Sequence, residues 1–160
     1  MDIIKANGIG AIEMLLAIAG TYGHADDEMI AIRKQLENEL SDAGKGRDIF
    51  IGSINSKAVA MIQIIYDNVE NDPELADGHN IAHIHNLQVR SELQRQGIGI
   101  NMMTFVEEIA GNKGFSVLTL GVDDINTGAI KLYKKISYKI VKEVPGRYPG
   151  EKCFYMKKLL

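Results

Sequence analysis

Hydrophobic residues recur every three or four positions in four segments, the spacing that places them on one face of an α-helix. In the first of these segments, Ile12, Leu15, Leu16 and Ala19 form a single apolar stripe. Asp26 or Asp27 is positioned to cap the second. The expected helices are Ala11–Ala19, from Asp26 or Asp27 to Leu40, Gly97–Ala110, and from Asn126 or Thr127 to Lys135.

Alternating or continuously apolar runs of β-forming residues predict the strands. Two of them are separated by Asn55-Ser-Lys57 and predict an antiparallel hairpin, whereas the acidic segment Asp67–Asn80 predicts a loop. The expected strands are Ile3–Lys5, Asp48–Ile54, Ala58–Tyr66, Ile81–Val89, Ser116–Val122, Tyr138–Val144 and Lys152–Leu159.

The order of these elements is strand, two helices, three strands, helix, strand, helix, two strands. This order favours an α/β (α+β) fold with a mixed, mostly antiparallel central sheet of about seven strands flanked by about four helices. The strand–loop–helix–strand portion supplies one parallel crossover, so a doubly wound fold is disfavoured. No linker or repeat interrupts the 160 residues, and we expect a single domain over 1–160.

Composition narrows the class of partner. The net charge of −3 and the pI near 5.8 give no overall attraction to nucleic acid or to an anionic membrane. The apolar run Ile9–Ala19 is interrupted by Glu13 and is too short to span a bilayer. Cys153 is the only cysteine, which suits a reducing cytoplasm and predicts a packed thiol rather than a reactive one.

The turn between the strand ending at Val89 and the helix expected from Gly97 is rich in glycine. Gln94, Gly97 and Gly99 follow a strand and open a helix, where free main-chain N–H groups and the helix dipole attract a pyrophosphate. The dinucleotide pattern G-x-G-x-x-G fails because the residue three past Gly99 is Met102, and the Walker pattern lacks its lysine.

A second block follows about thirty residues later and reads Asn126-Thr-Gly-Ala-Ile-Lys-Leu-Tyr133-Lys-Lys-Ile-Ser137-Tyr138. The two blocks together resemble the GNAT superfamily of acyl-CoA-dependent N-acyltransferases, over roughly Asp48–Leu160. Ser137 departs from the resemblance because the family usually has glycine there. If that position needs a positive φ, serine costs about 1 kcal/mol.

The resemblance implies a sheet with splayed central strands and acetyl-CoA as cosubstrate, without a metal. It implies main-chain contacts from Leu87 and Val89 to the pantetheine arm, main-chain donors at the pyrophosphate, and Tyr133 beside the thioester sulfur. Asn126 is otherwise a helix cap, and Tyr133 is otherwise a core aromatic. The implied cofactor-binding residues are Leu87, Gln88, Val89, Gln94, Arg95, Gln96, Gly97, Ile98, Gly99, Ile100, Asn126, Ala129 and Tyr133.

His83 and His85 lie two apart on a strand, so both side chains project from one face unless a bulge intervenes. Their string resembles the arylalkylamine N-acetyltransferase branch, in which two such histidines deprotonate the amine. Either one is therefore a candidate base, acting on an ammonium whose pKa is near 10.4 in an ordinary alkylamine. A shared metal is disfavoured, since only His24 and His79 remain and no ligand motif is present.

The leading hypothesis is an enzyme that moves acetyl from acetyl-CoA to a primary amine of a small molecule or peptide by direct attack, with Tyr133 as proton donor. The alternatives are a catalytically silent acyl-CoA-binding sensor or partner module, and an α/β domain whose glycine loop only starts a helix. From the resemblance, Tyr22, His24 and Glu28 are candidates for the acceptor pocket, and a homodimer is possible.

Overall fold

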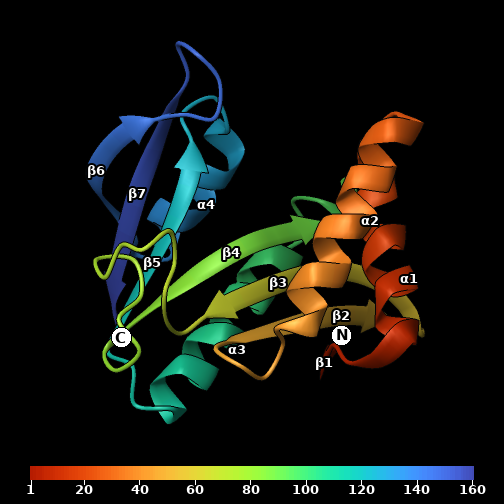
Figure 1. The fold of residues 1–160 in the computed structure, drawn as a ribbon, viewed down its shortest axis with the longest axis horizontal. Helices are drawn as coiled ribbons and strands as arrows, with labels where there is room; N and C mark the ends of the chain where they lie inside the picture. Colours follow the sequence, from red (N-terminus) through yellow and green to blue (C-terminus); the bar gives the residue numbers. More distant parts are fainter. The chain divides into compact units, whose positions relative to one another are not determined.

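The computed structural model describes residues 1–160, except for the side chain of Ile9, which lies outside the described residues. The helices and strands follow the predicted order (Figure 1). Their bounds are β1 Asp2–Lys5, α1 Gly8–Ala19, α2 Asp26–Ser41, β2 Arg47–Ile54, β3 Lys57–Ile65, β4 Ile81–Val89, α3 Ile98–Asn112, β5 Val117–Asp123, α4 Thr127–Lys135, β6 Lys139–Pro145 and β7 Lys152–Leu159.

The seven strands form one sheet in the order β1-β2-β3-β4-β5-β7-β6. β4 and β5 are parallel, whereas β1/β2, β5/β7 and β6/β7 are antiparallel. The prediction of a mixed α/β fold with about seven strands and one parallel crossover is confirmed. Two compact units share this chain: unit 1 comprises Met1–Ile64 and Asn86–Thr104, and unit 2 comprises Ile65–His85 and Phe105–Leu160.

In unit 1, α1 and α2 lie side by side (Figure 1). The stripe predicted for α1 is buried as expected and belongs to a core with Leu36 of α2 and with Ile49 and Ile51 of β2. Burial of this apolar stripe stabilises α1, whose N-cap residue Asn7 makes no capping hydrogen bond with its side chain.

The start of α2 differs from the prediction. Its N-cap is Ala25, and Asp26 lies inside the first turn. The prediction was wrong because Glu28 reaches back and accepts a hydrogen bond from the Ala25 N–H at 3.0 Å. That contact satisfies the N–H of the N-cap residue itself, and the three acidic residues of the first turn interact favourably with the helix dipole.

The hairpin in unit 1 is tighter than predicted. Asn55 and Ser56 both have positive φ, at 49° and 62°, and form a two-residue turn, while Lys57 is already in β3. Two consecutive left-handed residues define the turn type whose twist matches that of the flanking strands.

In unit 2, β4 begins beside β5, with Ile81 opposite Val117 and Ile84 opposite Leu120. Asn86, immediately after the part of β4 that belongs to unit 2, has a φ of 51°, which interrupts the regular pleat. The splaying of the central strands, which the resemblance implies, stays a prediction.

The helix α3 buries one apolar face. Met102, Met103, Val106 and Ala110 are buried, and Ile100 is half-buried. The helix starts one residue later than predicted, at Ile98, which is itself 6% exposed.

α4 ends in a left-handed turn at Ser137, whose φ is 75°. The N–H of Ser137 donates to the Lys134 carbonyl, and that of Tyr138 donates to the Tyr133 carbonyl. This pair of bonds is the Schellman motif, and the Tyr133 and Tyr138 rings, 6.0 Å apart, supply its usual apolar contact. The C-terminal turn therefore fixes where Tyr133 sits.

Replacing Ser137 with glycine should stabilise the protein, because glycine adopts a positive φ without the steric cost of a β-carbon. We expect the free energy of unfolding in urea to rise by about 0.5–1 kcal/mol, after the greater freedom of glycine in the unfolded chain is counted. Ser137→Ala, which keeps the β-carbon, should give no gain. A glycine variant no more stable than the alanine variant would show that the turn is unstrained.

Candidate functional site

The chain turns from β4 into α3 through residues 90–97. Arg95 and Gly97 have φ of 62° and 85°, and α3 begins at the next residue. The Asn101 N–H makes a helical bond to the Gly97 carbonyl at 3.0 Å, so the N–H groups of residues 98–100 have no preceding turn to donate to. A β-carbon built on Gly97 meets nothing within 4 Å. The loop therefore has open space beside Gly97.

Side chains within unit 1 hold this loop in place. The Tyr22 hydroxyl donates to the Val89 carbonyl at 2.5 Å, and the Gln94 amide nitrogen lies 3.2 Å from that hydroxyl and 3.3 Å from the same carbonyl. The contact predicted between the Val89 carbonyl and pantetheine thus competes with two internal donors. The structure gives Gln94 and Tyr22 a bracing role that the sequence did not predict.

Thr21 and Ser91 complete the brace. The Ser91 N–H donates to the Thr21 hydroxyl at 3.1 Å, and the Ser91 hydroxyl donates to the Thr21 carbonyl at 2.8 Å. No sequence signal linked two residues 70 positions apart.

The remaining predicted cofactor residues of unit 1 lie along β4 and the loop. Gln88 donates to the Asn86 side-chain oxygen at 2.7 Å, while its own Oε1 is buried without a partner. Leu87 and Ile100 are half-buried, and Arg95 and Gln96 are exposed. Gly99 is buried in the first turn of α3.

In unit 2, Asn126 caps α4: its side-chain oxygen accepts from the Ala129 N–H at 3.1 Å. The helix-cap interpretation is therefore correct as a description of this contact, and the Asn126 amide NH₂ is not used by it. Ala129 itself is half-buried.

Tyr133 is 8% exposed. Burial disfavours the charged phenolate and raises the pKa of Tyr133 to about 12. The phenol therefore keeps its proton at neutral pH and can donate it. Its neighbour Tyr138 is more deeply buried, and its hydroxyl meets no well-aligned hydrogen-bond partner. Burial and the nearby Glu107 carboxylate raise the pKa of Tyr138.

His83 and His85 lie side by side in unit 2, with ring centroids 6.5 Å apart, as expected for alternate positions on one face of a strand. His83 is 6% exposed and His85 is half-buried. Nδ1 of His83 lies 2.8 Å from the Thr119 hydroxyl, and that hydroxyl donates to the Leu75 carbonyl at 2.7 Å. No motif or periodicity pointed to Thr119, which is 36 residues away from His83 in the sequence.

The acidic loop that carries Leu75 makes several hydrogen bonds within unit 2. The Asp77 carboxylate accepts from the N–H groups of His79, Asn80 and Ile81 at 3.0, 2.8 and 2.8 Å. These bonds, led by the one from Ile81, lower the pKa of Asp77 from 3.8 to about 2. Glu70 accepts from the Tyr155 hydroxyl at 3.3 Å.

The three candidate acceptor residues gather at the start of α2 in unit 1. Nδ1 of His24 lies 3.4 Å from the Glu28 carboxylate, and the rings of Tyr22 and His24 are 6.4 Å apart. The structure thus brings them together, although the Tyr22 hydroxyl is already engaged by β4 and the Glu28 carboxylate also caps α2.

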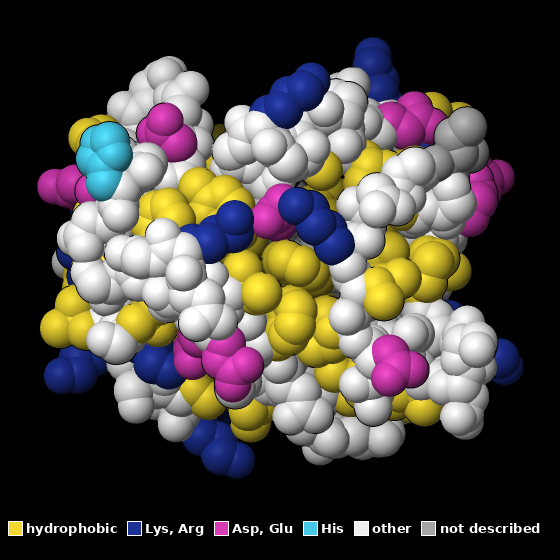
Figure 2. Space-filling view, turned by 90° about the horizontal axis from the view of Figure 1, so that it is seen from below, with side chains coloured by type: hydrophobic (Ala, Val, Ile, Leu, Met, Phe, Trp, Pro, Cys, Tyr) yellow, Lys and Arg dark blue, Asp and Glu magenta, His cyan; other side chains and the backbone are white. Residues whose placement is uncertain are grey.

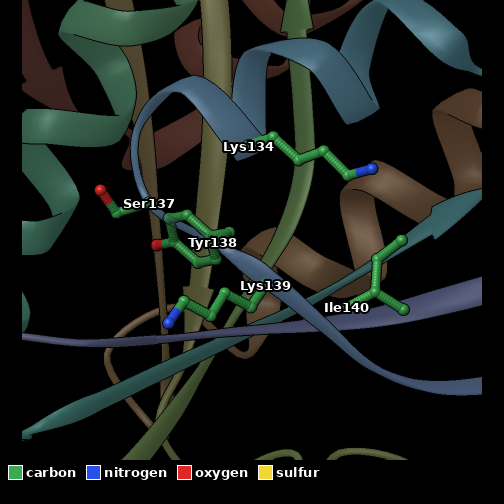
Figure 3. A pocket seen from close by; sticks show the side chains of 5 residues that line it. All are labelled: Lys134, Ser137, Tyr138, Lys139 and Ile140. Carbon is green, nitrogen blue, oxygen red and sulfur yellow. The ribbon is translucent and has the colours of Figure 1, made fainter.

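Two cavities are lined entirely by residues of unit 2. The first, of about 550 Å³, is lined by Lys134, Ser137, Tyr138, Lys139 and Ile140, and the two lysine amines point away from each other (Figure 3). It holds none of the predicted catalytic residues. The second, of about 430 Å³, is lined in part by Thr119, Leu75 and Tyr155.

The electrostatics of the surface are mixed. On the face drawn in Figure 2, basic and acidic side chains are interspersed around exposed apolar ones.

Among the described residues, no group of three His, Cys, Asp or Glu side chains could hold a metal ion. Within the same residues, none of the helices has both the length and the apolar character needed to cross a membrane.

Cys153 is half-buried, and burial raises the pKa of its thiol. A raised pKa reduces the thiolate fraction at neutral pH, which is the nucleophilic form. The prediction of an unreactive thiol is consistent with this environment.

The fold and these motifs define an acyltransferase-like α/β protein, and comparison with known proteins gives its family. The model of the acetyltransferase (GNAT) family matches residues 12–138. The chain therefore belongs to the GNAT acetyltransferase family, as the two sequence blocks predicted.

Three individual proteins that this chain resembles share 37% or less of its residues over the matched length. A thialysine N-epsilon-acetyltransferase from Bos taurus is 37% identical over 78 residues, which is 46% of this chain and 45% of that protein. The chain thus matches less than half the length of this relative. An aminoglycoside 6'-N-acetyltransferase crystallised with coenzyme A superposes with a TM-score of 0.76 at 17% identity, over 99% of this chain and 97% of that one. The ribosomal-protein-S18-alanine N-acetyltransferase from Escherichia coli gives 0.74 at 19% identity, over 99% and 92%.

The charge on Asp77 should make stability depend on pH in the acid range. The folded-state pKa is lowered, so the carboxylate stabilises the fold above its ordinary pKa of 3.8, and that contribution is lost as the pH falls toward 2. Asp77→Asn keeps an acceptor oxygen but not the charge. We expect the variant to unfold at lower urea concentration than the native chain near neutral pH, with the two midpoints drawing together as the pH falls from 3.8 to about 2. Midpoints that stay equally far apart at both pH values would contradict the assignment.

Proposed function

We propose that the chain acts as a single acetyltransferase domain over residues 1–160, which transfers acetyl from acetyl-CoA to a primary amine of a small molecule or peptide. One observation carries this proposal: an open, glycine-started helix N-terminus at α3 and a buried, protonated Tyr133 at the matching position of the second block occur in one chain of the GNAT family. A domain that only bound acyl-CoA would have no need of a proton donor.

The cofactor fits the residues that are present. The main-chain N–H groups of residues 98–100 would donate to the pyrophosphate, and Gly97 leaves the space that a side chain would fill. Arg95 adds a positive charge to the same loop. The Asn126 amide NH₂ and the main chain of Leu87 are the donors that we assign to the pantetheine arm. When bound, acetyl-CoA supplies an acetyl group activated as a thioester.

Side chains of the protein then accept and donate the protons that move during acetyl transfer. The substrate nitrogen attacks the carbonyl carbon directly, so a bond to nitrogen forms and the carbon–sulfur bond breaks. His83 or His85, directly or through water, accepts the proton that the nitrogen loses. Tyr133, which is still protonated at neutral pH, donates its proton to the departing thiolate. Cys153 takes no part, since direct attack requires no covalent enzyme intermediate.

The class of acceptor is inferred from the amines that related enzymes acetylate, more than from the residues assigned to the acceptor pocket. The names of the three relatives specify thialysine, an aminoglycoside and the alanine of a ribosomal protein. All three acceptors present a primary amine. We assign Tyr22, His24 and Glu28 to the acceptor side, where the Glu28 carboxylate would attract a cationic amine.

The test of this function is release of coenzyme A thiol when the protein is mixed with acetyl-CoA and a panel of amines. The panel contains thialysine, lysine, an aminoglycoside and a peptide that begins with alanine. We expect saturable turnover with at least one of them. Tight binding of coenzyme A without turnover on any amine would instead support the silent sensor or partner module.

Tyr133→Phe should lower kcat by about a hundredfold or more, because the departing thiolate then lacks its proton donor. The KM for acetyl-CoA should change by no more than about twofold, since the ring is retained. Tyr138→Phe makes the same one-atom change at a hydroxyl without a partner, and it should leave kcat unchanged. Equal losses in both variants would mean that removal of a buried hydroxyl, not of the acid, is responsible.

Gly97→Val should weaken acetyl-CoA binding. A β-branched valine is strained at the left-handed φ of 85° that Gly97 adopts, and holding that conformation for binding costs about 1–2 kcal/mol. We therefore expect the KM for acetyl-CoA to rise by about tenfold or more, measured by initial rates. Gly111→Ala, in the same helix with no positive φ and open space around it, is the control and should have no such effect. An unchanged KM in the Gly97 variant would remove this loop from the cofactor site.

A further inference from the structure

A chain of two hydrogen bonds in unit 2 connects His83 with the main chain of the acidic loop. His83 Nδ1 and the Thr119 hydroxyl are 2.8 Å apart, and the same hydroxyl lies 2.7 Å from the Leu75 carbonyl oxygen. His83, Thr119 and Leu75 are 6%, 3% and 2% exposed, so water does not readily replace either bond.

Only one placement of hydrogens satisfies both contacts. A carbonyl oxygen can only accept, so the single hydroxyl proton of Thr119 must point to Leu75. The hydroxyl is then left with lone pairs toward His83, and Nδ1 of His83 must carry the proton that it accepts. If Nδ1 were unprotonated, two acceptors would compete for one proton, and a buried acceptor would be left unsatisfied.

This placement decides the chemistry of the other ring nitrogen. A neutral imidazole carries one proton, and the hydrogen bond made by one nitrogen sets which of the two holds it. With the proton on Nδ1, the lone pair of neutral His83 is on Nε2. The ring is thereby fixed both in orientation and in tautomer.

Neighbouring residues hold Thr119 and the Leu75 carbonyl in position. Thr119 is directly opposite His83 in the parallel register of β4 and β5. Leu75 packs in a small core with Ile65, Val69 and Ala76, and the three main-chain bonds to Asp77 fix the loop just beyond it. The hydroxyl therefore meets a carbonyl that cannot readily turn away.

We propose that Thr119 is a positioning residue that locks His83 in the Nδ1-protonated tautomer, so that Nε2 accepts the proton from the amine, directly or through one water. This inference rests on the proposed function only for the use to which Nε2 is put. The tautomer itself is a property of the protein without substrate.

The first test is the nitrogen spectrum of the histidine rings in the free protein. With ¹⁵N-labelled histidine above about pH 8, where an ordinary imidazole is neutral, a long-range ¹H–¹⁵N spectrum distinguishes the protonated from the unprotonated nitrogen of each ring. We expect His83 to show a protonated Nδ1 and an unprotonated Nε2, and His83→Gln identifies its signals. A His83 with its proton on Nε2 overturns the proposal, whatever the activity.

The second test uses variants of Thr119. Thr119→Val keeps the shape and removes the hydroxyl, so the His83 signals should change to those of a tautomer mixture, while the His85 signals stay unchanged. Thr119→Ser restores the hydroxyl and should restore the native spectrum. Thr104→Val, at an exposed position of α3, is the control for the substitution itself and should change neither ring.

Turnover gives a third, separable readout. We expect Thr119→Val to lower kcat by about tenfold or more, as a part of the contribution of a general base, and Thr119→Ser to recover most of it. In a His83→Ala background, the valine substitution should have no further effect on kcat. An equal fold-loss with and without His83 would show that Thr119 acts only on packing.

If the valine variant does not fold, the native spectrum and the serine variant still decide whether Thr119 sets the tautomer of His83. A confirmed tautomer without turnover on any amine would refute the proposed function and leave the tautomer assignment intact.

Discussion

The constraint on which the account depends is the way the chain leaves β4 and starts α3. Two left-handed residues, Arg95 and Gly97, turn the chain so that α3 begins with N–H groups that have no preceding turn to bond. Such groups are a ready site for a phosphate, because the bonds and the helix dipole act in the same direction. The cost of the turn is met by the brace of Tyr22, Gln94 and the Val89 carbonyl. The same internal bonds that shape the loop thus keep its open donors available.

In unit 2, the proposed proton donor and the proposed base are each held by neighbouring groups. Burial keeps the phenol of Tyr133 protonated, and the Schellman turn at Ser137 holds the helix end from which that ring projects. On the strand side, Thr119 and the Leu75 carbonyl orient His83. In the proposed reaction, each group would thus be held by neighbours that take no part in the chemistry themselves. Groups fixed before the substrate arrives do not have to reorganise during the chemical step.

Much of the fold could be predicted from the sequence, because periodicity and turn residues are local signals. β4 and β7 have the predicted bounds, and the other elements differ by a few residues at their ends. The wrong start of α2 has a local cause as well: the Glu28 carboxylate accepts from the Ala25 N–H, and Ala25 rather than an aspartate is the N-cap. The positive φ suspected at Ser137 is present.

The site could be predicted only where a residue belongs to a contiguous block. The glycine loop, Asn126, Tyr133 and the histidine pair were all visible in this way. The contacts of Tyr22 with Val89 and of His83 with Thr119 join positions 67 and 36 residues apart, and no periodicity specifies such pairs. They emerge only when the strands are in register, which is why Gln94 was assigned to the cofactor rather than to the loop brace.

The most direct measurement of the central claim is a titration of the ¹H–¹⁵N amide spectrum with coenzyme A. The account predicts large, saturable shifts at residues 97–100, none there on addition of pantetheine, which lacks the pyrophosphate, and none in the first turn of α2. Saturable binding of coenzyme A that leaves the amides of residues 97–100 unmoved would contradict it.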